Sequence, residues 1–164
     1  MVVRPIRLIG DPALTEQAEP VRDFDKQLRV LVKDLMHTLR GDGRRAGLSA
    51  PQIGVPLRVL AFSVHGRQGH VVNPVLEPSE RTQDGDEGCL SAPGLWVPVR
   101  RAYQVVVRGS DAQGRPVTVR ALGAFARCLQ HEADHLDGVL FVDRLEPEHR
   151  AEADRRIAAA GWTA

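Results

Sequence analysis

The segment HEADH at residues 131–135 carries two histidines four positions apart, with Glu132 beside the first. Residues four apart lie on one face of an α-helix, so the imidazoles of His131 and His135 can bind one metal ion. Glu132 can reach a water bound to that metal and act on it as a general base. The segment is typical of metal-dependent hydrolases, although two surface histidines on a charged helix would also produce it.

A catalytic metal site usually has three protein ligands and one open position, so a third ligand is required. Cys128 is excluded on distance, because seven residues at about 1.5 Å each place it about 10 Å from His135 along a helix. We expect Cys128 to be a small buried hydrophobic residue. The spacing leaves open the upstream Cys89 or a downstream ligand of the kind that zinc endopeptidases use: Glu146, Glu148, His149 or Glu152.

Two further segments precede the histidine pair: GLSAPQ at residues 47–52 and EGCLS at residues 87–91. Together with QHEADH at residues 130–135, they resemble the three signature motifs of peptide deformylases in order and spacing. The resemblance runs from about residue 4 to residue 145. Three motifs in the right order are highly specific for that family.

The resemblance implies a set of metal ligands and a base. Cys89, His131 and His135 would bind one divalent transition metal, and Glu132 would be the general acid and base. A thiolate with two imidazoles suits Fe²⁺, Zn²⁺, Co²⁺ or Ni²⁺. Because the family normally works with Fe²⁺, ferrous iron is the metal expected in the cell.

The resemblance also implies supporting residues. Gln52 and the backbone N–H of Leu90 would stabilise the charge that develops on the formyl oxygen. Glu87 would orient a metal ligand and pair with an arginine, which we place at Arg101. The loop that contains Gly47 would offer backbone groups to a substrate peptide lying alongside as an added strand.

The implied reaction removes the N-terminal formyl group from N-formylmethionyl peptides of newly synthesised proteins. A metal-activated water would attack the formyl carbon, and Glu132 would take its proton and deliver it to the departing amine. The implied partners are nascent formylmethionyl peptides, with room for transient ribosome association. An apolar pocket would take the methionine side chain, but four nearby apolar residues are expected in the core instead: Leu95, Trp96, Phe125 and Leu129.

Composition limits the other functions of the chain. The 22 basic and 21 acidic residues give a net charge of +1, and aromatic residues make up only 4%. We therefore expect no direct nucleic-acid function. No apolar run approaches about 18 residues, so no membrane association is expected. The N-terminus does not resemble a secretory signal, which favours a cytoplasmic protein with reduced cysteines.

The elements that must position these residues follow from apolar spacing. A helix is predicted over residues 24–39, with Asp23 as N-cap and the segment Gly41-Asp42-Gly43 as its end. Strands are predicted at residues 57–64 and 70–75, and as a hairpin of residues 103–109 and 117–121 across a turn at 111–114. Helical spacing returns at residues 123–137 before Gly138, and a last helix is predicted from Pro147 to about residue 160.

The predicted fold class is α+β, with mostly antiparallel strands packed around a central metal-binding helix and with an N-terminal and a C-terminal helix. We expect a single catalytic domain over residues 1–164, in which residues 145–164 form a helical tail.

The chain departs from the family pattern at two positions. Arg45 stands where the family usually has glycine, and Ser49 stands where alanine is usual. Neither change removes a catalytic group, but both bear on substrate preference and catalytic efficiency. We expect the long cationic side chain of Arg45 to project near the mouth of the site. The connection over residues 64–70 also looks short.

Three alternative functions are weighed against this one. A zincin-type metallopeptidase would take its third ligand downstream of His135 and would leave residues 87–91 unexplained. A diverged paralogue would deformylate another formamide substrate. A non-catalytic, ribosome-associated binding module would have no use for Glu132, so the presence of that residue argues against it.

Overall fold

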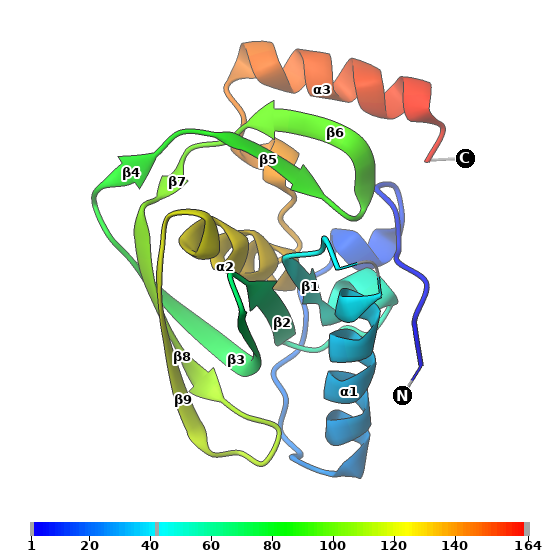
Figure 1. The fold of residues 1–164 in the computed structure, drawn as a ribbon. Coiled ribbons are helices and arrows are strands. Elements are labelled where there is room, and N and C mark those ends of the chain that lie inside the picture. The colour runs from blue at the N-terminus through cyan, green and yellow to red at the C-terminus, as the bar shows by residue number, and fades with distance from the viewer. Residues whose placement is uncertain (1, 42, 163–164) are drawn as a thin grey trace.

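The computed structural model describes residues 2–41 and 43–162, and Figure 1 shows their arrangement. The α-helices are α1 (Lys26–Arg40), α2 (Gly123–Leu136) and α3 (Pro147–Ala160). The strands are β1 (Gly47–Ser49), β2 (Val59–Val64), β3 (Arg67–Pro78), β4 (Thr82–Gln83), β5 (Asp86–Cys89), β6 (Ala92–Pro98), β7 (Arg101–Ala102), β8 (Gln104–Ser110) and β9 (Pro116–Leu122). Short 3-10 helices are η1 (Pro12–Leu14), η2 (Ala50–Ile53) and η3 (Phe141–Arg144).

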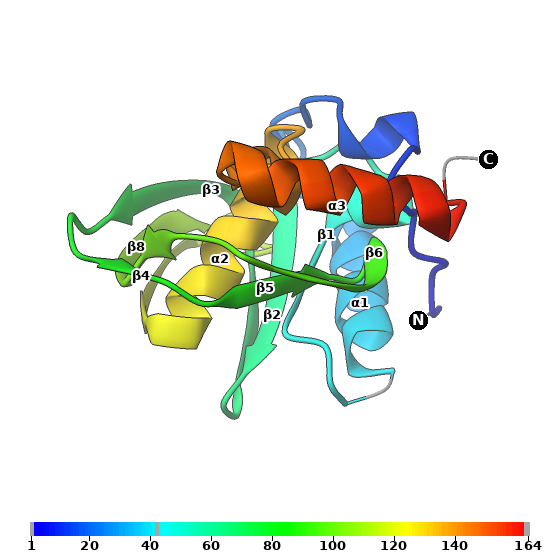
Figure 2. The ribbon, with the colours of Figure 1, turned by 90° about the horizontal axis from the view of Figure 1, so that it is seen from above.

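The largest sheet has five strands in the order β1-β2-β3-β8-β9, and every neighbouring pair is antiparallel. Two smaller antiparallel sheets, β4–β7 and β5–β6, account for the other strands of the described residues. In Figures 1 and 2, α2 lies between the large sheet and the β5–β6 hairpin, and α3 lies outside that hairpin. The predicted α+β class, with antiparallel strands around a central helix, is confirmed.

Helix α1 begins two residues later than predicted. The side chain of Asp25, not Asp23, accepts a hydrogen bond from the backbone N–H of Leu28 at 3.0 Å, so Asp25 is the N-cap. A side-chain acceptor at this position satisfies one of the free N–H groups of the first turn. The helix ends before Gly41. Asp42, the middle residue of the predicted end, lies outside the described residues.

The short connection between the second and third strands is a tight turn. β2 and β3 pair from Val64 and Arg67 onward, which leaves only His65 and Gly66 between them. Both residues have positive φ, at 49° and 78°. Two-residue turns of this handedness match the twist of antiparallel strands, so no longer loop is needed.

Helix α2 is buried on most of its circumference. Nine of its 14 residues are buried, and five of these are polar, charged or a thiol, listed in order as Cys128, His131, Glu132, Asp134 and His135. Buried polar groups need hydrogen-bond or ion-pair partners, so this helix must be surrounded by groups that supply them. The predicted Gly138 follows the helix with φ of 70°, and α3 begins at Pro147 as predicted.

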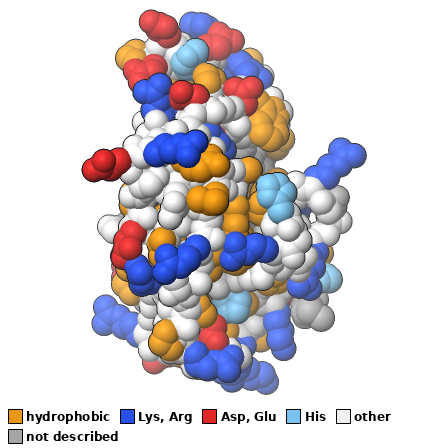
Figure 3. All heavy atoms as spheres, turned by 60° about the vertical axis from the view of Figure 1, so that its left-hand side comes forward, with side chains coloured by type: hydrophobic (Ala, Val, Ile, Leu, Met, Phe, Trp, Pro, Cys, Tyr) orange, Lys and Arg blue, Asp and Glu red, His pale blue; other side chains and the backbone are white. Residues whose placement is uncertain are grey.

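Charged side chains of both signs cover much of the surface. On the face shown in Figure 3, acidic and basic groups are mixed over the upper part, where α3 lies, and Lys and Arg dominate lower down. Within residues 2–41 and 43–162, no helix combines the length and the apolar character needed to cross a membrane.

Candidate functional site

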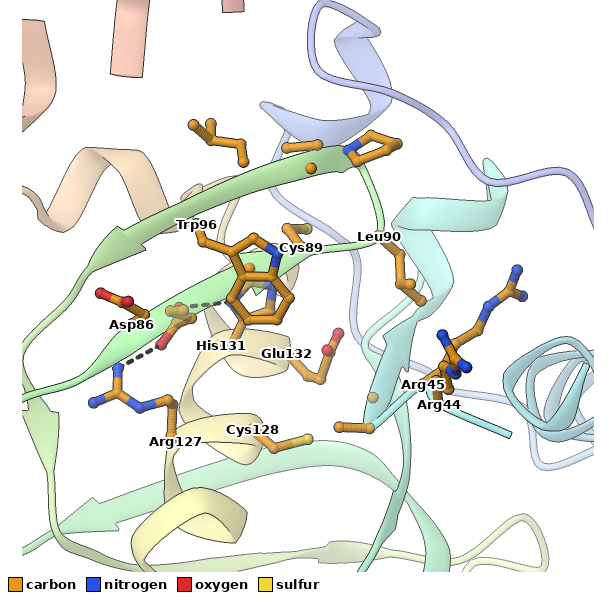
Figure 4. A pocket seen from close by; sticks show the side chains of 18 of the residues that line it. Arg44, Arg45, Asp86, Cys89, Leu90, Trp96, Arg127, Cys128, His131 and Glu132 are labelled. Carbon is orange, nitrogen blue, oxygen red and sulfur yellow. Dashed lines mark hydrogen bonds and ion pairs between the residues drawn. The ribbon is translucent and has the colours of Figure 1, made fainter. Parts of the chain in front are cut away.

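Three side chains from two elements converge beside the pocket seen in Figure 4. Cys89 ends β5, and His131 and His135 lie one turn apart on α2. Their sulfur and ring-nitrogen atoms lie within 4.8 Å of one another. Nε2 of His135 lies 3.3 Å from Sγ of Cys89 and 3.2 Å from Nε2 of His131. The structure therefore brings the upstream cysteine, and not a downstream residue, to the histidine pair.

The downstream candidates for a third ligand lie at the exposed start of α3, and they are Glu146, Glu148, His149 and Glu152. Over residues 2–41 and 43–162, Cys89, His131 and His135 form the one group of His, Cys, Asp and Glu side chains that is compact enough to hold a metal. Cys128 is not part of that group, and it is buried as expected.

The donor set fits a divalent transition metal. Nδ1 of His131 is bonded to Glu87 at 2.7 Å, which leaves its Nε2 directed toward Cys89 and His135. One sulfur and two imidazole nitrogens that face one another are the ligands that such ions prefer. In addition, Oε2 of Glu132 is buried and has no hydrogen-bond partner in the described part of the chain. A buried carboxylate oxygen without a partner is explained by a water or ion beside it.

The carboxylate of Glu87 is held by an arginine and a histidine. Arg101 donates from Nε to Oε1 at 3.0 Å and from Nη2 to Oε2 at 2.6 Å. Burial would raise the pKa of Glu87, but the hydrogen bonds with His131 and Arg101 outweigh it and lower the pKa to about 2. An ionised Glu87 fixes the ring of His131 with Nδ1 protonated and Nε2 free. The structure thus places Glu87 and Arg101 together, as the resemblance implies.

Further charged residues that the sequence did not predict surround Glu87 and Arg101. Asp134 accepts hydrogen bonds from Arg101 at 2.6 Å and from Arg144 at 2.7 Å and 3.1 Å. Arg127 donates to Oε1 of Glu87 at 3.1 Å. The sequence contains one indication of these ion pairs: Asp134 lies inside a helix that is packed on nearly all sides, and a buried aspartate requires a cationic partner. The partners themselves come from other elements, and spacing along the chain does not identify them.

Glu132 lies against β1. A Cβ atom added to Gly47 would lie 2.5 Å from Oε1 of Glu132 and 2.8 Å from Sγ of Cys128, so only glycine fits there. Burial raises the pKa of Glu132 to about 7. Burial likewise raises the pKa of the Cys128 thiol, which stays neutral. A carboxyl group with such a pKa can accept and donate a proton near neutral pH.

The amide of Gln52 lies next to the sulfur of Cys89. Its Nε2 lies 3.7 Å from Sγ of Cys89 and 3.1 Å from Oγ of Ser91. Its Oε1 accepts hydrogen bonds from the backbone N–H of Ser49 at 2.9 Å and from the Ser49 hydroxyl at 3.1 Å. Ser49, one of the two departures from the family pattern, therefore helps to fix the orientation of the Gln52 side chain.

Several of the site residues line a pocket of about 600 Å³, whereas Gln52 and His135 lie behind its wall and are not lining residues. Gly47, Glu87, Cys89, Leu90, Cys128, His131 and Glu132 all contribute to its wall. Of the four apolar residues expected in the core, Phe125 and Leu129 are buried there. Leu95 is buried but also lines the pocket, and Trp96 is 63% exposed at the pocket. The expectation that Trp96 belongs to the core is wrong, because alternation along β6 turns its side chain outward.

Arg45 lines the pocket as expected, but its guanidinium is directed partly away from it. Nη1 of Arg45 donates to the backbone carbonyl of Thr38 at 2.8 Å, near the C-terminal end of α1. A cation there satisfies a carbonyl of the last helical turn.

Comparisons with known proteins agree with the geometry. The family model described as polypeptide deformylase matches residues 3–151. The chain is 58% identical over 162 residues to a peptide deformylase of Acidothermus cellulolyticus, a match that spans 99% of this chain and 89% of the relative. It is 50% identical to a peptide deformylase of Parafrankia sp. over 99% of this chain and 90% of that protein. The crystal structure of a peptide deformylase from Legionella pneumophila is similar with a TM-score of 0.89 at 40% identity, over 97% of this chain and 95% of that one.

Proposed function

The chain belongs to the peptide deformylase family, and we propose that Cys89, His131 and His135 hold its metal ion while Glu132 moves the proton in the hydrolysis. The enzyme is a hydrolase that removes formyl groups from peptides. The observation that carries the assignment of ligands is the convergence of Cys89 with the two histidines, within 4.8 Å. Beside them, Oε2 of Glu132 is buried and has no hydrogen-bond partner among the described residues.

A divalent metal bound by these three residues lowers the pKa of a water and polarises a carbonyl group. We propose Fe²⁺ as the metal in the cell, with Zn²⁺, Ni²⁺ and Co²⁺ as other ions that the same ligands accept. Ferrous iron on a thiolate is prone to oxidation by air, whereas nickel is not. Iron-loaded protein should therefore lose activity in air faster than nickel-loaded protein, and equal half-lives would contradict the choice of iron.

Glu132 is the residue that carries the proton. Its carboxylate would accept a proton from the attacking water and deliver it to the nitrogen of the departing amine. A pKa of about 7, raised by burial, suits both halves of this transfer. The contact with Gly47 keeps the carboxylate at a fixed place in the pocket wall.

Gln52 and Leu90 would receive the formyl oxygen. The amide oxygen of Gln52 accepts two hydrogen bonds from Ser49, which turns its Nε2 donor toward Cys89. The formyl oxygen would take the place of Sγ of Cys89 or Oγ of Ser91, to which Nε2 donates in this structure, as its acceptor. The backbone N–H of Leu90 follows Cys89 directly and lies at the pocket, since Leu90 is one of the lining residues. Two fixed donors at a developing negative charge stabilise the transition state more than the substrate.

The peptide would bind along strand β1. Among the described residues, β1 pairs with β2 alone and is the edge of the sheet. Its other edge would pair with an extended peptide. Gly47 on that strand lines the pocket, which accommodates the methionine side chain. We propose N-formylmethionyl nascent chains as the natural substrate and the cytoplasm as the place of action, with contact to the ribosome only transient.

The alternatives receive less support. A zincin-type metallopeptidase needs a third ligand after His135, but the candidates on α3 are exposed and outside the metal group. A binding module does not need a buried carboxylate poised near neutral pH. A different formamide substrate would be indicated by hydrolysis of a small formamide with a kcat/KM that exceeds that for formyl peptides.

The proposal is tested with anaerobically purified, iron-loaded protein and formyl-Met-Ala-Ser. Wild type should release formate, and Glu132→Gln should keep its metal while kcat falls roughly 100-fold or more. Formate release by Glu132→Gln within a few-fold of wild type would show that another group moves the proton. Arg45→Gly should leave kcat nearly unchanged and alter KM for longer formyl peptides, most of all for acidic ones.

A further inference from the structure

Trp96 is a large aromatic residue exposed at the catalytic pocket. Six large apolar side chains in the described part of the chain are markedly exposed: Val2, Val3, Val30, Val75, Trp96 and Leu122. Of these, only Trp96 lines the pocket, and 63% of it is exposed. Figure 4 shows its indole in front of the site, on the same side as Cys89 and His131. An exposed apolar group at a binding site marks a surface that a ligand can cover.

The indole packs against the β5–β6 hairpin. Glu87 pairs with Val97 in this hairpin. Side chains alternate along a strand, so Gly88, which follows Glu87, and Trp96, which precedes Val97, lie on the opposite face. A Cβ atom on Gly88 would lie 2.9 Å from Cε2 and Cζ3 of Trp96. The indole therefore lies directly over Gly88, and a larger residue at position 88 would require the indole to move. Because Leu95 and Val97 are buried, the side chain between them must point outward.

The surroundings of the indole favour an apolar ligand. Pro93, Gly94, Leu95 and Ala124 line the same pocket, and each presents mainly carbon atoms. The same lining also includes charged residues, among them Arg44, Arg45, Asp86 and Arg127. Nη1 of Arg127 donates to Glu87 and to the carbonyl of Val99. An aromatic ring that rests on backbone at one face offers its free edge and other face to aliphatic or aromatic groups.

We propose that Trp96 is a specificity-determining residue that binds an apolar side chain of the formyl peptide downstream of its first residue. The inference rests on the proposed function. The formyl group and the first residue belong beside Cys89 and Glu132, and an extended peptide gains about 3.3 Å per residue as it leaves the site. On this path the second and third residues would pass along the pocket wall that includes Trp96. Peptides with large apolar residues there gain a contact that peptides with alanine do not.

The kinetic test compares formyl-Met-Ala-Phe, formyl-Met-Phe-Ala and formyl-Met-Ala-Ala as substrates. In Trp96→Ala, kcat/KM should fall about 5- to 10-fold more for at least one of the phenylalanine peptides than for the alanine peptide, through KM and not kcat. Trp96→Phe should retain most of the preference. The matched control is Val75→Ala, which removes a 66% exposed apolar side chain outside the pocket. This variant should show the wild-type preference for the phenylalanine peptides.

A binding measurement gives a readout that does not depend on turnover. The chain has two tryptophans, so Trp162→Phe leaves Trp96 as the single indole fluorophore. Titration with the product peptides Met-Ala-Phe and Met-Phe-Ala should change its emission at lower concentrations than Met-Ala-Ala does. Equal loss of kcat/KM for all three substrates in Trp96→Ala, or equal titration curves for the products, would overturn the inference. Absence of formate release from every peptide by wild type would instead overturn the proposed function.

Discussion

Gly47 and Glu132 are packed so closely that a single added carbon at residue 47 would lie 2.5 Å from Oε1 of the glutamate. The edge strand that we propose for peptide binding therefore also sets the place of the catalytic carboxylate. This contact couples the substrate-binding element to the proton-transfer group without any hydrogen bond between them.

Gly47→Ala should displace Glu132 and lower kcat roughly 10- to 100-fold while the metal content stays at the wild-type level. Because the sulfur of Cys128 lies 2.8 Å from the same added carbon, Cys128→Ala should restore part of the lost activity in the double variant. Steady-state kinetics with elemental analysis measures both effects. Wild-type kcat in Gly47→Ala would mean that the carboxylate has room to move.

Ser49→Ala removes one of the two hydrogen bonds that Oε1 of Gln52 accepts, and the backbone N–H of residue 49 retains the other. We expect kcat/KM to fall about 2- to 10-fold, as for the loss of one buried hydrogen bond. In a Gln52→Ala background the same substitution should have almost no further effect on kcat/KM, because its partner is gone. Independent, additive losses in this double-mutant cycle would show that Ser49 acts elsewhere.

His70 predicts a pH dependence of stability. Burial lowers the pKa of His70, and its neutral Nε2 accepts a hydrogen bond from the backbone N–H of Ala112 at 3.0 Å. The folded protein thus binds a proton at this residue less readily than the unfolded chain, whose histidine titrates near 6.5. The stabilising contribution is therefore present above pH 6.5 and is lost as the pH falls below it. Thermal unfolding at pH 5.5 and 7.5 should show a smaller pH effect in His70→Gln, and an unchanged difference would contradict this assignment.

The sequence predicted the three α-helices and the strands β2, β3, β8 and β9 because their signals are local, but it did not predict the seven-residue β6. The 3.6-residue spacing of Leu28, Val32, Leu35 and Leu39 places α1, and short apolar runs bounded by turns place β2 and the β8–β9 hairpin. Asp23 and Asp25 have the same side chain, so residue type does not decide which of them is the N-cap. The extended backbone of Asp25, directly before the first helical residue, makes it the N-cap. β1, with three residues, is too short to produce a periodic signal.

The sequence predicted the metal ligands, but it did not predict the arginines that surround them or the exposure of Trp96. The order of the three motifs predicted Cys89 as a ligand, although Cys89 lies 42 positions before His131 and no helical spacing connects the two residues. Arg144 and Arg127 reach Asp134 and Glu87 through the tertiary fold alone. Trp96 was assigned to the core from its residue type, whereas the register of β5 and β6 determines its exposure.

The most direct test of the metal centre is the metal content of four variants by elemental analysis after anaerobic purification. Cys89→Ala, His131→Ala and His135→Ala should lose the ion that wild type holds, while Cys128→Ala should retain one transition-metal ion per chain. Retention by Cys89→Ala, or loss in Cys128→Ala alone, would contradict the assignment of Cys89 as the third ligand.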